Sequence, residues 1–311
     1  MSEHGMVSII TVNYNGWRDT CAMIDSLWQH EPGPEAGGVA YEVIVVDNAS
    51  AGDDADRIET YLAERRLNFS KGGQGHPPYP VVTLLRSDTN RGFAGGNNLA
   101  LPLAKGDYLF FLNNDTEIHA PVLPQMVERF ESDLRIGALS PLIRFAHTPD
   151  EVQYAGDWCL TPITLRNRCP DADLPNRHSV SRPVEVLHGA AMMLRRDVVE
   201  QIGPMYEGYF LFYEEFDWSY AVLRAGYQVW FEASAVIYHK EGKTIGLRTP
   251  LRERYLVRSR LRFASRWVPL PQRLLTYLYL VGPVTLRNVL QYALHGQWAL
   301  LKATLQGILC W

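Results

Sequence analysis

Short apolar runs alternate with longer mixed segments through the first 120 residues of the chain. Four runs rich in β-branched and aromatic residues stop abruptly at polar residues, at positions 7–12, 41–46, 81–85 and 108–112. Runs of this length are typical of buried strands and are too short for most helices. Helices are expected between them, over residues 17–30 and 53–66 and from the turn at 90–97. The alternation predicts an α/β, Rossmann-like fold, in which a mostly parallel sheet carries helices on both faces.

The second half of the chain departs from this alternation. Residues 146–183 are rich in Pro, Asp, Asn and Arg, which favours a loop or hairpin, and the apolar run at 184–187 predicts one more strand. Arginines then recur at every fourth position from residue 254 to residue 266, with apolar residues mostly on the other side, which predicts a basic amphipathic helix. We therefore expect an α/β domain over residues 1–247 and a helical C-terminal segment over residues 248–311.

Polar residues follow three of the predicted strands. Thr11 and Asn13 end the first strand, Asp47 ends the second, and Asn114 and Asp115 follow the fourth. Because the carboxyl ends of parallel strands meet at one edge of a sheet, we expect these side chains to converge. The first three could supply the donors and acceptors that a base and a ribose need. Asp115 could hold a hard cation and, through it, a diphosphate, unless this stretch is only a turn and helix cap.

A glycine-rich turn at residues 90–97 opens the helix after the third strand. Gly92, Gly95 and Gly96 would let backbone amides approach a ligand closely at the N-terminus of this helix. The turn is not the dinucleotide-binding fingerprint, because its glycines are spaced differently and the preceding strand ends earlier.

Composition and charge narrow the classes of protein. A chain of 311 residues with 47% hydrophobic content can bury a full core. The net charge of −4 conceals an asymmetry, because residues 1–239 hold 18 Lys and Arg against 32 Asp and Glu, whereas residues 240–311 hold 12 against 2. An acidic body fits nucleic-acid binding poorly, and the basic tail points to another anionic partner. Four cysteines without a C-x-x-C pair favour free thiols in a reducing cytoplasm, and the N-terminus does not resemble a signal peptide.

The order of these motifs resembles that of the inverting glycosyltransferases of family 2, which have the GT-A fold. The resemblance rests first on VSIITVNYNG, VIVVDNAS, NRGFAGGNN and LFFLNNDT, at residues 7–16, 43–50, 90–98 and 109–116. It continues through residues 188–192, 213–217, 224–227 and 238–239, and so covers roughly residues 7 to 265. NRGFAGGNN and LNNDT are most similar to the rhamnosyltransferase-like bacterial members that build surface polysaccharides.

The resemblance implies roles for the strand-end residues. Asp47 would recognise the nucleobase of a dTDP- or UDP-sugar, in a nucleotide site formed with Thr11, Asn13, Asn90, Arg91, Gly92, Asn97 and Asn114. Asp115 would bind Mg²⁺ or Mn²⁺, with His239 completing the shell or contacting the diphosphate. Family members usually have a D-x-D-like pair, whereas this chain has Asn113 and a single carboxylate, which suits Mg²⁺ because this ion keeps several waters. A plain strand-end histidine is the alternative for His239.

A second acidic group, at residues 214–217, matches the family position of the general base. The resemblance implies this role for Glu215, although Asp is more common there, and places Glu214, Asp217, Gly189 and Ala190 beside the donor sugar and acceptor. An inverting transfer needs one base to take the proton of the attacking acceptor hydroxyl. The alternatives are acids that complement a helix dipole and small residues that only ease packing.

The C-terminal segment has two interpretations. Its arginines and the Trp, Tyr and Leu residues beside them fit docking on an anionic leaflet, and its longest uncharged runs, 13 and 14 residues, are shorter than a membrane span. Alternatively, the basic helix packs on the α/β domain. The exposed apolar surface of the C-terminal segment could also serve a homodimer as readily as a membrane. Arg258 falls where family members often show Tyr-x-x-Arg-Asn, which implies a diphosphate contact.

Together these features predict a metal-dependent inverting glycosyltransferase. The resemblance implies that it would move a sugar, with rhamnose from dTDP-rhamnose as the expected donor, onto a lipid-linked glycan at the cytoplasmic face of the membrane. Two alternatives stay open, namely a sugar-1-phosphate nucleotidylyltransferase and a non-catalytic membrane-bound scaffold that binds sugar nucleotides. The first should open with a Gly-rich, Arg- or Lys-bearing loop, where this chain has Thr-Val-Asn-Tyr-Asn-Gly.

Overall fold

The computed structural model describes residues 5–70, 80–169, 176–241 and 249–311. The segment between the helix expected over residues 53–66 and the strand expected over residues 81–85 lies mostly outside this part. The helices are α1 (Trp17–His30), α2 (Asp54–Ser70), α3 (Gly92–Ala100), α4 (Leu123–Ser132), α5 (Arg196–Ile202), α6 (Glu214–Arg224), α7 (Pro250–Trp267), α8 (Leu270–Tyr279), α9 (Thr285–Leu294) and α10 (Trp298–Leu309), with the short turns η1 (Pro34–Ala36) and η2 (Leu280–Val284). The strands are β1 (Val7–Asn13), β2 (Tyr41–Asp47), β3 (Val81–Arg86), β4 (Tyr108–Leu112), β5 (Thr116–Glu117), β6 (Ile136–Phe145), β7 (Val152–Tyr154), β8 (Cys159–Leu160), β9 (Asn167–Arg168), β10 (Arg182–Val184), β11 (Ala191–Arg195) and β12 (Gln228–His239).

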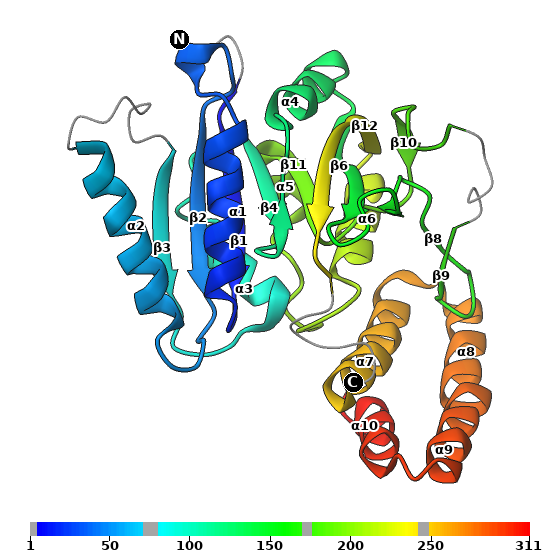
Figure 1. The fold of residues 1–311 in the computed structure, drawn as a ribbon. Coiled ribbons are helices and arrows are strands. Elements are labelled where there is room, and N and C mark those ends of the chain that lie inside the picture. The colour runs from blue at the N-terminus through cyan, green and yellow to red at the C-terminus, as the bar shows by residue number, and fades with distance from the viewer. Residues whose placement is uncertain (1–4, 71–79, 170–175, 242–248) are drawn as a thin grey trace.

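One large sheet forms the centre of the molecule, in the order β10-β12-β6-β11-β4-β1-β2-β3 (Figure 1). The four strands expected from the first half of the chain are present, and β1 pairs in parallel with both β2 and β4. The second half is mixed, because β11 runs antiparallel between β4 and β6. The sheet is therefore parallel where the nucleotide motifs lie and mixed beyond them.

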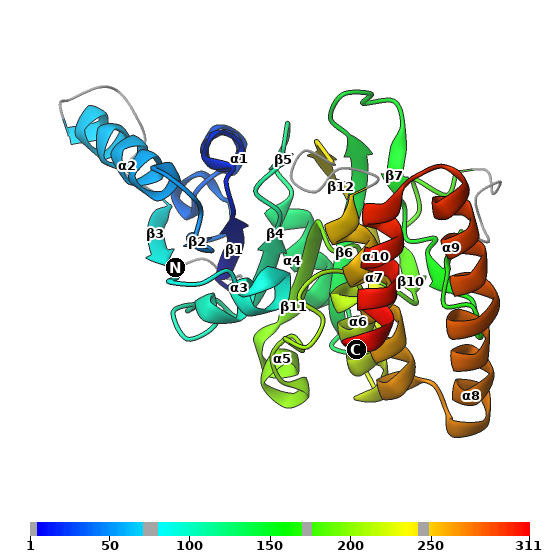
Figure 2. The same ribbon diagram turned by 90° about the horizontal axis from the view of Figure 1, so that it is seen from below.

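Helices cover both faces of this sheet, as the alternation predicts (Figures 1 and 2). One apolar cluster joins the sheet to α1, α2 and α4, and a second joins its other face to α3, α5 and α6. Successive residues of a strand point to opposite faces, so Ile9 belongs to the first cluster and Ile10 to the second. Both are fully buried.

The strand expected over residues 184–187 is wrong in its position. β10 ends at Val184, and β11 begins only at Ala191. The backbone N–H groups of Leu187 and His188 donate to the hydroxyls of Ser219 and Ser140, at 2.9 and 3.0 Å. The backbone N–H groups of these two buried residues are therefore satisfied by side-chain hydroxyls and need no partner in a neighbouring strand. Residues 146–183 contain the expected hairpin, formed by β8 and β9.

The C-terminal helices stand beside the sheet rather than on it. α7 packs against α6 and α10, and α8, η2 and α9 form one nearly continuous helix on the outer side of α7 and α10 (Figures 1 and 2). η2 is a π-helical turn that contains Pro283, and a residue without a backbone N–H accounts for this irregularity. No helix in the described part of the chain is long and apolar enough to cross a bilayer. None of the four cysteines, all of which lie in the described part of the chain, forms a disulfide.

Candidate active site

The polar residues that follow β1, β2 and β4 meet at one edge of the sheet. Asn13 lies opposite Asp47 in the β1–β2 register, and its amide donates to the Asp47 carboxylate over 2.7 Å. The Thr20 hydroxyl donates to Asn13 Oδ1 at 2.9 Å and accepts from the Asn114 amide at 3.0 Å. Thr20 of α1 thus links Asn13 to Asn114, and Asn13 in turn binds Asp47. Thr11 is also buried there, and its hydroxyl has no partner among the described residues.

Asn48 holds the glycine-rich turn in place, although the strand-end pattern did not single it out. Its amide donates to Asn90 Oδ1 at 3.1 Å and to the Gly92 carbonyl at 3.0 Å, and its own oxygen accepts from the backbone N–H of Arg91. Gly92 has a φ of 70°, and a β-carbon there would lie 2.2 Å from the Phe210 carbonyl oxygen. Only glycine fits such a position. Asn48 directly follows Asp47, and this adjacency is the sequence signal that could have identified it.

Two predicted nucleotide residues have partners elsewhere. Arg91 forms an exposed ion pair with Glu207 at 3.1 Å. Asn97 is buried in α3, where its amide donates to the Phe93 carbonyl at 2.9 Å. Neither residue lines the cavity at the strand ends. Their contacts show how the turn and α3 are fixed.

This cavity has a volume of about 330 Å³, which falls in the range of small-molecule sites. Its polar wall comes from the strand ends and the turn, and includes the predicted residues Asn90, Gly92, Asn114, Asp115 and His239. Its apolar wall is formed mainly by Val12, Phe93, Phe210, Leu211, Phe212 and Leu251. Of the strand-end residues, Asn114 and Asp115 line this cavity, whereas Thr11, Asn13 and Asp47 lie outside its lining.

Asp115 and His239 face each other at the edge of this cavity. His239 Nε2 lies 3.1 Å from Asp115 Oδ1, and both side chains are largely buried. His239 Nδ1 lies 2.9 Å from Gln153 Oε1. Because an amide oxygen can only accept, Nδ1 carries a hydrogen, and Nε2 is directed at the carboxylate. Burial acts to raise the pKa of Asp115, but the hydrogen bond and charge of His239, with help from Lys240, outweigh it and lower the pKa.

This pair fits a divalent cation. A carboxylate oxygen and an imidazole nitrogen whose other nitrogen is fixed by a hydrogen bond are common metal ligands. Within the described residues no group of three or more His, Cys, Asp and Glu side chains gathers around a common point. A metal held by Asp115 and His239 would therefore complete its shell with waters and ligand oxygens, as Mg²⁺ and Mn²⁺ readily do.

The acidic group begins α6. Glu215 is half-buried, and burial raises its pKa to about 7, with backbone N–H groups partly offsetting the effect. A β-carbon at Gly189 would lie 3.9 Å from Glu215 Oε2, so this glycine leaves open space beside the carboxylate. The neighbouring Ala190 carbonyl accepts from the backbone N–H of Asn113 at 2.9 Å. The 189–190 turn therefore connects Glu215 with the loop that carries Asp115.

Glu214 and Asp217 differ from Glu215 in their surroundings. Glu214 is buried with one carboxylate oxygen unpartnered among the described residues, and burial together with the Glu215 charge raises its pKa well above the usual range. Asp217 is bound by Arg266 at 2.7 Å, by the Tyr209 hydroxyl at 2.7 Å and by the Trp267 indole at 2.6 Å. Its carboxylate thus joins α6 to α7, a role that the sequence did not indicate.

The segment before α6 is conformationally strained. Phe210, Phe212 and Tyr213 have φ values of 71°, 68° and 77°, which side chains with a β-carbon rarely adopt. The Phe210 carbonyl accepts from the Phe93 backbone N–H, which ties the segment to the glycine-rich turn. Strain of this kind concentrates at functional sites. Here it presents two phenylalanines to the cavity immediately before the acidic group.

The arginine stripe of α7 faces inward. The Nε atoms of Arg254, Arg258 and Arg262 are buried, Arg262 donates to the Gly208 carbonyl, and Arg266 binds Asp217. Burial and the charge of Arg262 lower the pKa of Arg258, which is not among the residues that line the cavity. The alternative of a helix packed on the α/β domain therefore describes α7, which contacts α6, and docking of this segment on a leaflet stays a prediction.

Comparison with known proteins identifies the family. The model of the family "Glycosyl transferase family 2" matches residues 8–203, so the chain belongs to this family. A hexosyltransferase of low-salt glycan biosynthesis, Agl10 of Haloferax volcanii, is 25% identical over 70% of this chain and 62% of its own length. The N-acetylglucosaminyl-diphospho-decaprenol L-rhamnosyltransferase of Mycobacterium tuberculosis is 26% identical over 53% of this chain and 61% of its own length. The matched region therefore spans about three fifths of these relatives.

A solved structure supports the fold. The mannosyltransferase PcManGT of Pyrobaculum calidifontis, in complex with GDP-Man and Mn²⁺, superposes with a TM-score of 0.57 and 16% identity, over 98% of this chain and 74% of that one. The expected GT-A fold is confirmed. Membership of this family decides against the nucleotidylyltransferase alternative.

Proposed function

We propose that this family 2 glycosyltransferase is an inverting, divalent-metal-dependent enzyme. The observation that carries the proposal is the Asp115–His239 pair at the edge of the cavity, linked through the 189–190 turn to a carboxylate with a pKa near 7. One group of residues would hold a nucleotide diphosphate and the other would accept a proton. An inverting transfer needs both.

The nucleotide would lie over the ends of β1 and β2. Asp47 would pair with the base, and its bond to Asn13 would hold it in position for this role. The backbone around Gly92 would approach the phosphates at the N-terminus of α3, where the helix dipole favours an anion. Asp115 and His239 would hold Mg²⁺ or Mn²⁺, which supplies positive charge against the diphosphate leaving group. Gln153 would keep His239 Nε2 aimed at this position.

Glu215 would be the general base. Its carboxylate would accept the proton of the acceptor hydroxyl while that oxygen attacks the anomeric carbon from the face opposite the diphosphate. A pKa near 7 suits this role, because a useful fraction of the side chain is ionised while it is still basic enough to take the proton. Glu214, in deeper surroundings, would stay protonated and line the site beside it.

The proposed reaction belongs to the synthesis of a cell-surface glycan. The mycobacterial relative is a rhamnosyltransferase, and by its name it acts on a sugar linked through a diphosphate to decaprenol. We extend this to rhamnose from dTDP-rhamnose as donor and a lipid-linked glycan as acceptor. A UDP-sugar is the alternative donor, since Asp47 can pair with uracil as well as with thymine.

The C-terminal segment, residues 248–311, would hold the enzyme at the cytoplasmic face of the membrane. Seven leucines on α8 and α9 have 53 to 83% of their surface accessible, and six of them, without Leu275, recur at intervals along the two helices. These six form the leucine stripe, defined as Leu270, Leu274, Leu278, Leu286, Leu290 and Leu294. An apolar surface of this length is unusual on a protein without a partner, and a leaflet or a second copy of the chain would cover it.

A panel of sugar nucleotides tests this proposal. Binding and hydrolysis of dTDP-rhamnose and of UDP- and GDP-sugars would be measured with Mg²⁺, with Mn²⁺ and with EDTA, for the wild type and for Asp115→Ala. We expect one donor to bind in a metal-dependent manner and Asp115→Ala to abolish that dependence. Binding that is unaffected by both metal and mutation would refute the metal assignment, and selective binding of another donor would replace rhamnose.

A further inference from the structure

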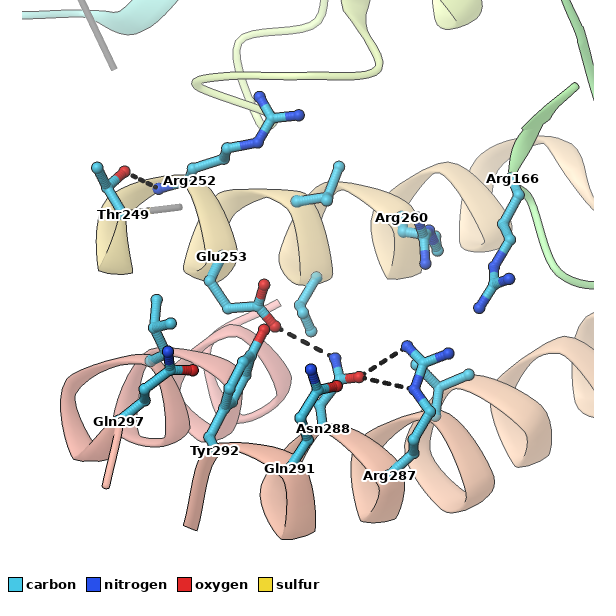
Figure 3. Close-up of a pocket in the computed structure, with 14 residues that line it drawn as sticks. Arg166, Thr249, Arg252, Glu253, Arg260, Arg287, Asn288, Gln291, Tyr292 and Gln297 are labelled. Atoms are coloured by element: carbon cyan, nitrogen blue, oxygen red, sulfur yellow. Dashed lines mark hydrogen bonds between the residues drawn. The ribbon is translucent and has the colours of Figure 1, made fainter. Parts of the chain in front are cut away.

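A second cavity lies between α7, α9 and α10, outside the nucleotide crevice (Figure 3). Its volume is about 350 Å³. The β8–β9 hairpin contributes Arg166, which reaches toward α9, and Arg287 of α9 points back toward the hairpin (Figure 3). With Arg260 of α7 these residues form a basic cluster at one end of the cavity, called here the arginine cavity.

The three arginines line the same cavity, and none of them is paired with an acidic side chain of the described residues. Among the described residues none of them takes part in an ion pair, although other arginines of the chain do. Arg287 donates to the amide oxygen of Asn288, and Arg260 donates to the hydroxyl of Tyr213 at 2.9 Å, both neutral acceptors. Like charges in one cavity repel, and an anion placed between them would relieve this repulsion.

The carboxylate that lines the arginine cavity is already engaged. Glu253 accepts from the Thr304 hydroxyl at 2.8 Å and from the Asn288 amide at 3.3 Å (Figure 3). These bonds fix it to α9 and α10 through neutral donors. Glu253 therefore holds the three helices together, and its single negative charge is exceeded by the charges of the four arginines that line the same cavity, Arg166, Arg252, Arg260 and Arg287.

We propose that the arginine cavity binds the phosphate or diphosphate group of a membrane lipid. Guanidinium groups present pairs of N–H donors whose spacing matches phosphate oxygens, so several of them around one cavity favour a phosphate over a lone carboxylate or a neutral sugar. Leu256, Val257, Val284 and Leu300 supply an apolar wall in the same cavity. A lipid with a phosphate head group and an apolar chain could contact both the arginines and this apolar wall.

The position of the cavity links it to the candidate active site. Tyr213, which Arg260 binds, directly precedes the acidic group that contains Glu215. Arg252 lies on the edge of both cavities, and its guanidinium stacks 5.2 Å from the ring centre of Phe212. A lipid phosphate in the arginine cavity would thus bind beside the segment that presents the proposed base. The assignment of this lipid as the glycan carrier rests on the proposed function, whereas the anion site itself does not.

The first test uses inorganic diphosphate as the probe. Calorimetric titration of the full-length protein in EDTA, at constant ionic strength, keeps the proposed metal from contributing. We expect Arg166→Gln/Arg287→Gln to weaken diphosphate binding about tenfold or more, since two charge-assisted contacts are lost. Arg273→Gln/Lys302→Gln, on α8 and α10, removes the same charge outside the cavity and is expected to change binding less than about twofold. Equal losses in both variants, or no binding by the wild type, would overturn the proposal.

Vesicles then identify the source of the phosphate. Co-sedimentation would compare phosphatidylcholine alone with phosphatidylcholine containing phosphatidylglycerol or a polyisoprenyl diphosphate, matched in surface charge. A preference for the polyisoprenyl diphosphate that the cavity variant loses assigns the site to the glycan carrier. Equal binding of both anionic vesicles, again lost in the cavity variant, assigns it to ordinary anionic lipid. Donor binding with Mn²⁺ in the same samples separates the two ideas, because its absence would contradict the proposed function and leave the anion site standing.

Discussion

The two carboxylates of the nucleotide crevice, Asp47 and Asp115, are each paired with a neighbouring side chain, whereas no acidic side chain among the described residues pairs with the arginines of the C-terminal cavity. In the crevice, Asp47 accepts from Asn13, and Asp115 lies against His239. In the arginine cavity, Arg166, Arg260 and Arg287 have no carboxylate partner among the described residues. The first arrangement holds its geometry before any ligand arrives, and the second is completed only by a ligand.

This difference matters for how each region would act. A transfer reaction requires groups that are already oriented, because reorganisation during the reaction raises its barrier. A membrane contact tolerates flexible arginines, since it needs affinity rather than precise alignment. We therefore expect substitutions in the crevice to reduce the rate of catalysis, and substitutions in the C-terminal helices to reduce binding to lipids.

The largest effect is expected at Glu215. Glu215→Gln keeps the size of the side chain and removes its ability to take a proton, so kcat should fall by about 10²–10⁴ while donor affinity changes little. Steady-state kinetics and donor titration would measure the two. Glu207→Gln, which breaks the exposed pair with Arg91, is the matched control and should leave kcat within about twofold.

The pH profile provides a second readout of Glu215. A base acts in its ionised form, and its pKa is raised to about 7, so kcat/KM should rise about tenfold per pH unit below pH 7 and level off above it. Wild type and Glu215→Gln would be compared over the same range. A profile that keeps its rise in the variant would assign the titration to another group and contradict the base assignment.

The junction between the two regions should show the next largest effect. Asp217→Ala leaves Arg266, Tyr209 and Trp267 without their shared acceptor, and loss of a largely buried ion pair should destabilise the protein by about 2–3 kcal/mol. Denaturant unfolding would measure this. Asp197→Ala, in the exposed pair with Arg195, should cost less than about 1 kcal/mol. Equal costs would mean that Asp217 does not hold α7 to α6.

A substitution at Gln153 tests whether the proposed metal site depends on the hydrogen bond between Gln153 and His239. Gln153→Leu removes the acceptor for His239 Nδ1, which frees the ring to reorient, and metal affinity should fall by about 10- to 100-fold. Mn²⁺ titration in the presence of donor nucleotide would detect the change. Gln201→Leu, on the exposed side of α5, is the control. Unchanged Mn²⁺ affinity in Gln153→Leu would exclude His239 as an oriented ligand.

The sequence predicted the crevice far better than the C-terminal region. Strand ends such as those at Asn13, Asp47 and Asp115 are local signals, and the topology of a parallel sheet then brings them together. The burial of the arginines on α7, such as Arg258, was not predictable in this way. α7 packs its apolar side against a hydrophobic cluster and also buries the Nε atoms of arginines on its other side, and local sequence does not show this second contact. The pairing of Asp217 with Arg266 likewise depends on how two helices pack.

The same argument explains the two other misses. Residues 184–187 have a strand-like pattern, but the Ser219 hydroxyl binds the backbone N–H of Leu187, and the Ser140 hydroxyl binds that of the following His188. No local pattern predicts such distant partners. The arginine cavity assembles residues from positions 166, 260 and 287, and the first and last of these lie more than a hundred residues apart along the chain. Only the packing of the β8–β9 hairpin on the C-terminal helices shows that they meet.

The smallest effect is expected from the leucine stripe, and it decides what covers that surface. Leu274→Ser/Leu278→Ser removes apolar side chains that are 57% and 70% exposed, so the protein should unfold at the same temperature as the wild type. If a leaflet covers the stripe, binding to phosphatidylglycerol-containing vesicles should fall about tenfold. Leu103→Ser/Leu134→Ser, exposed on the α/β domain, should leave vesicle binding unchanged. If light scattering instead shows a wild-type dimer that the stripe variant converts to monomers, a second copy of the chain covers the stripe, and the arginine cavity alone would carry the lipid contact.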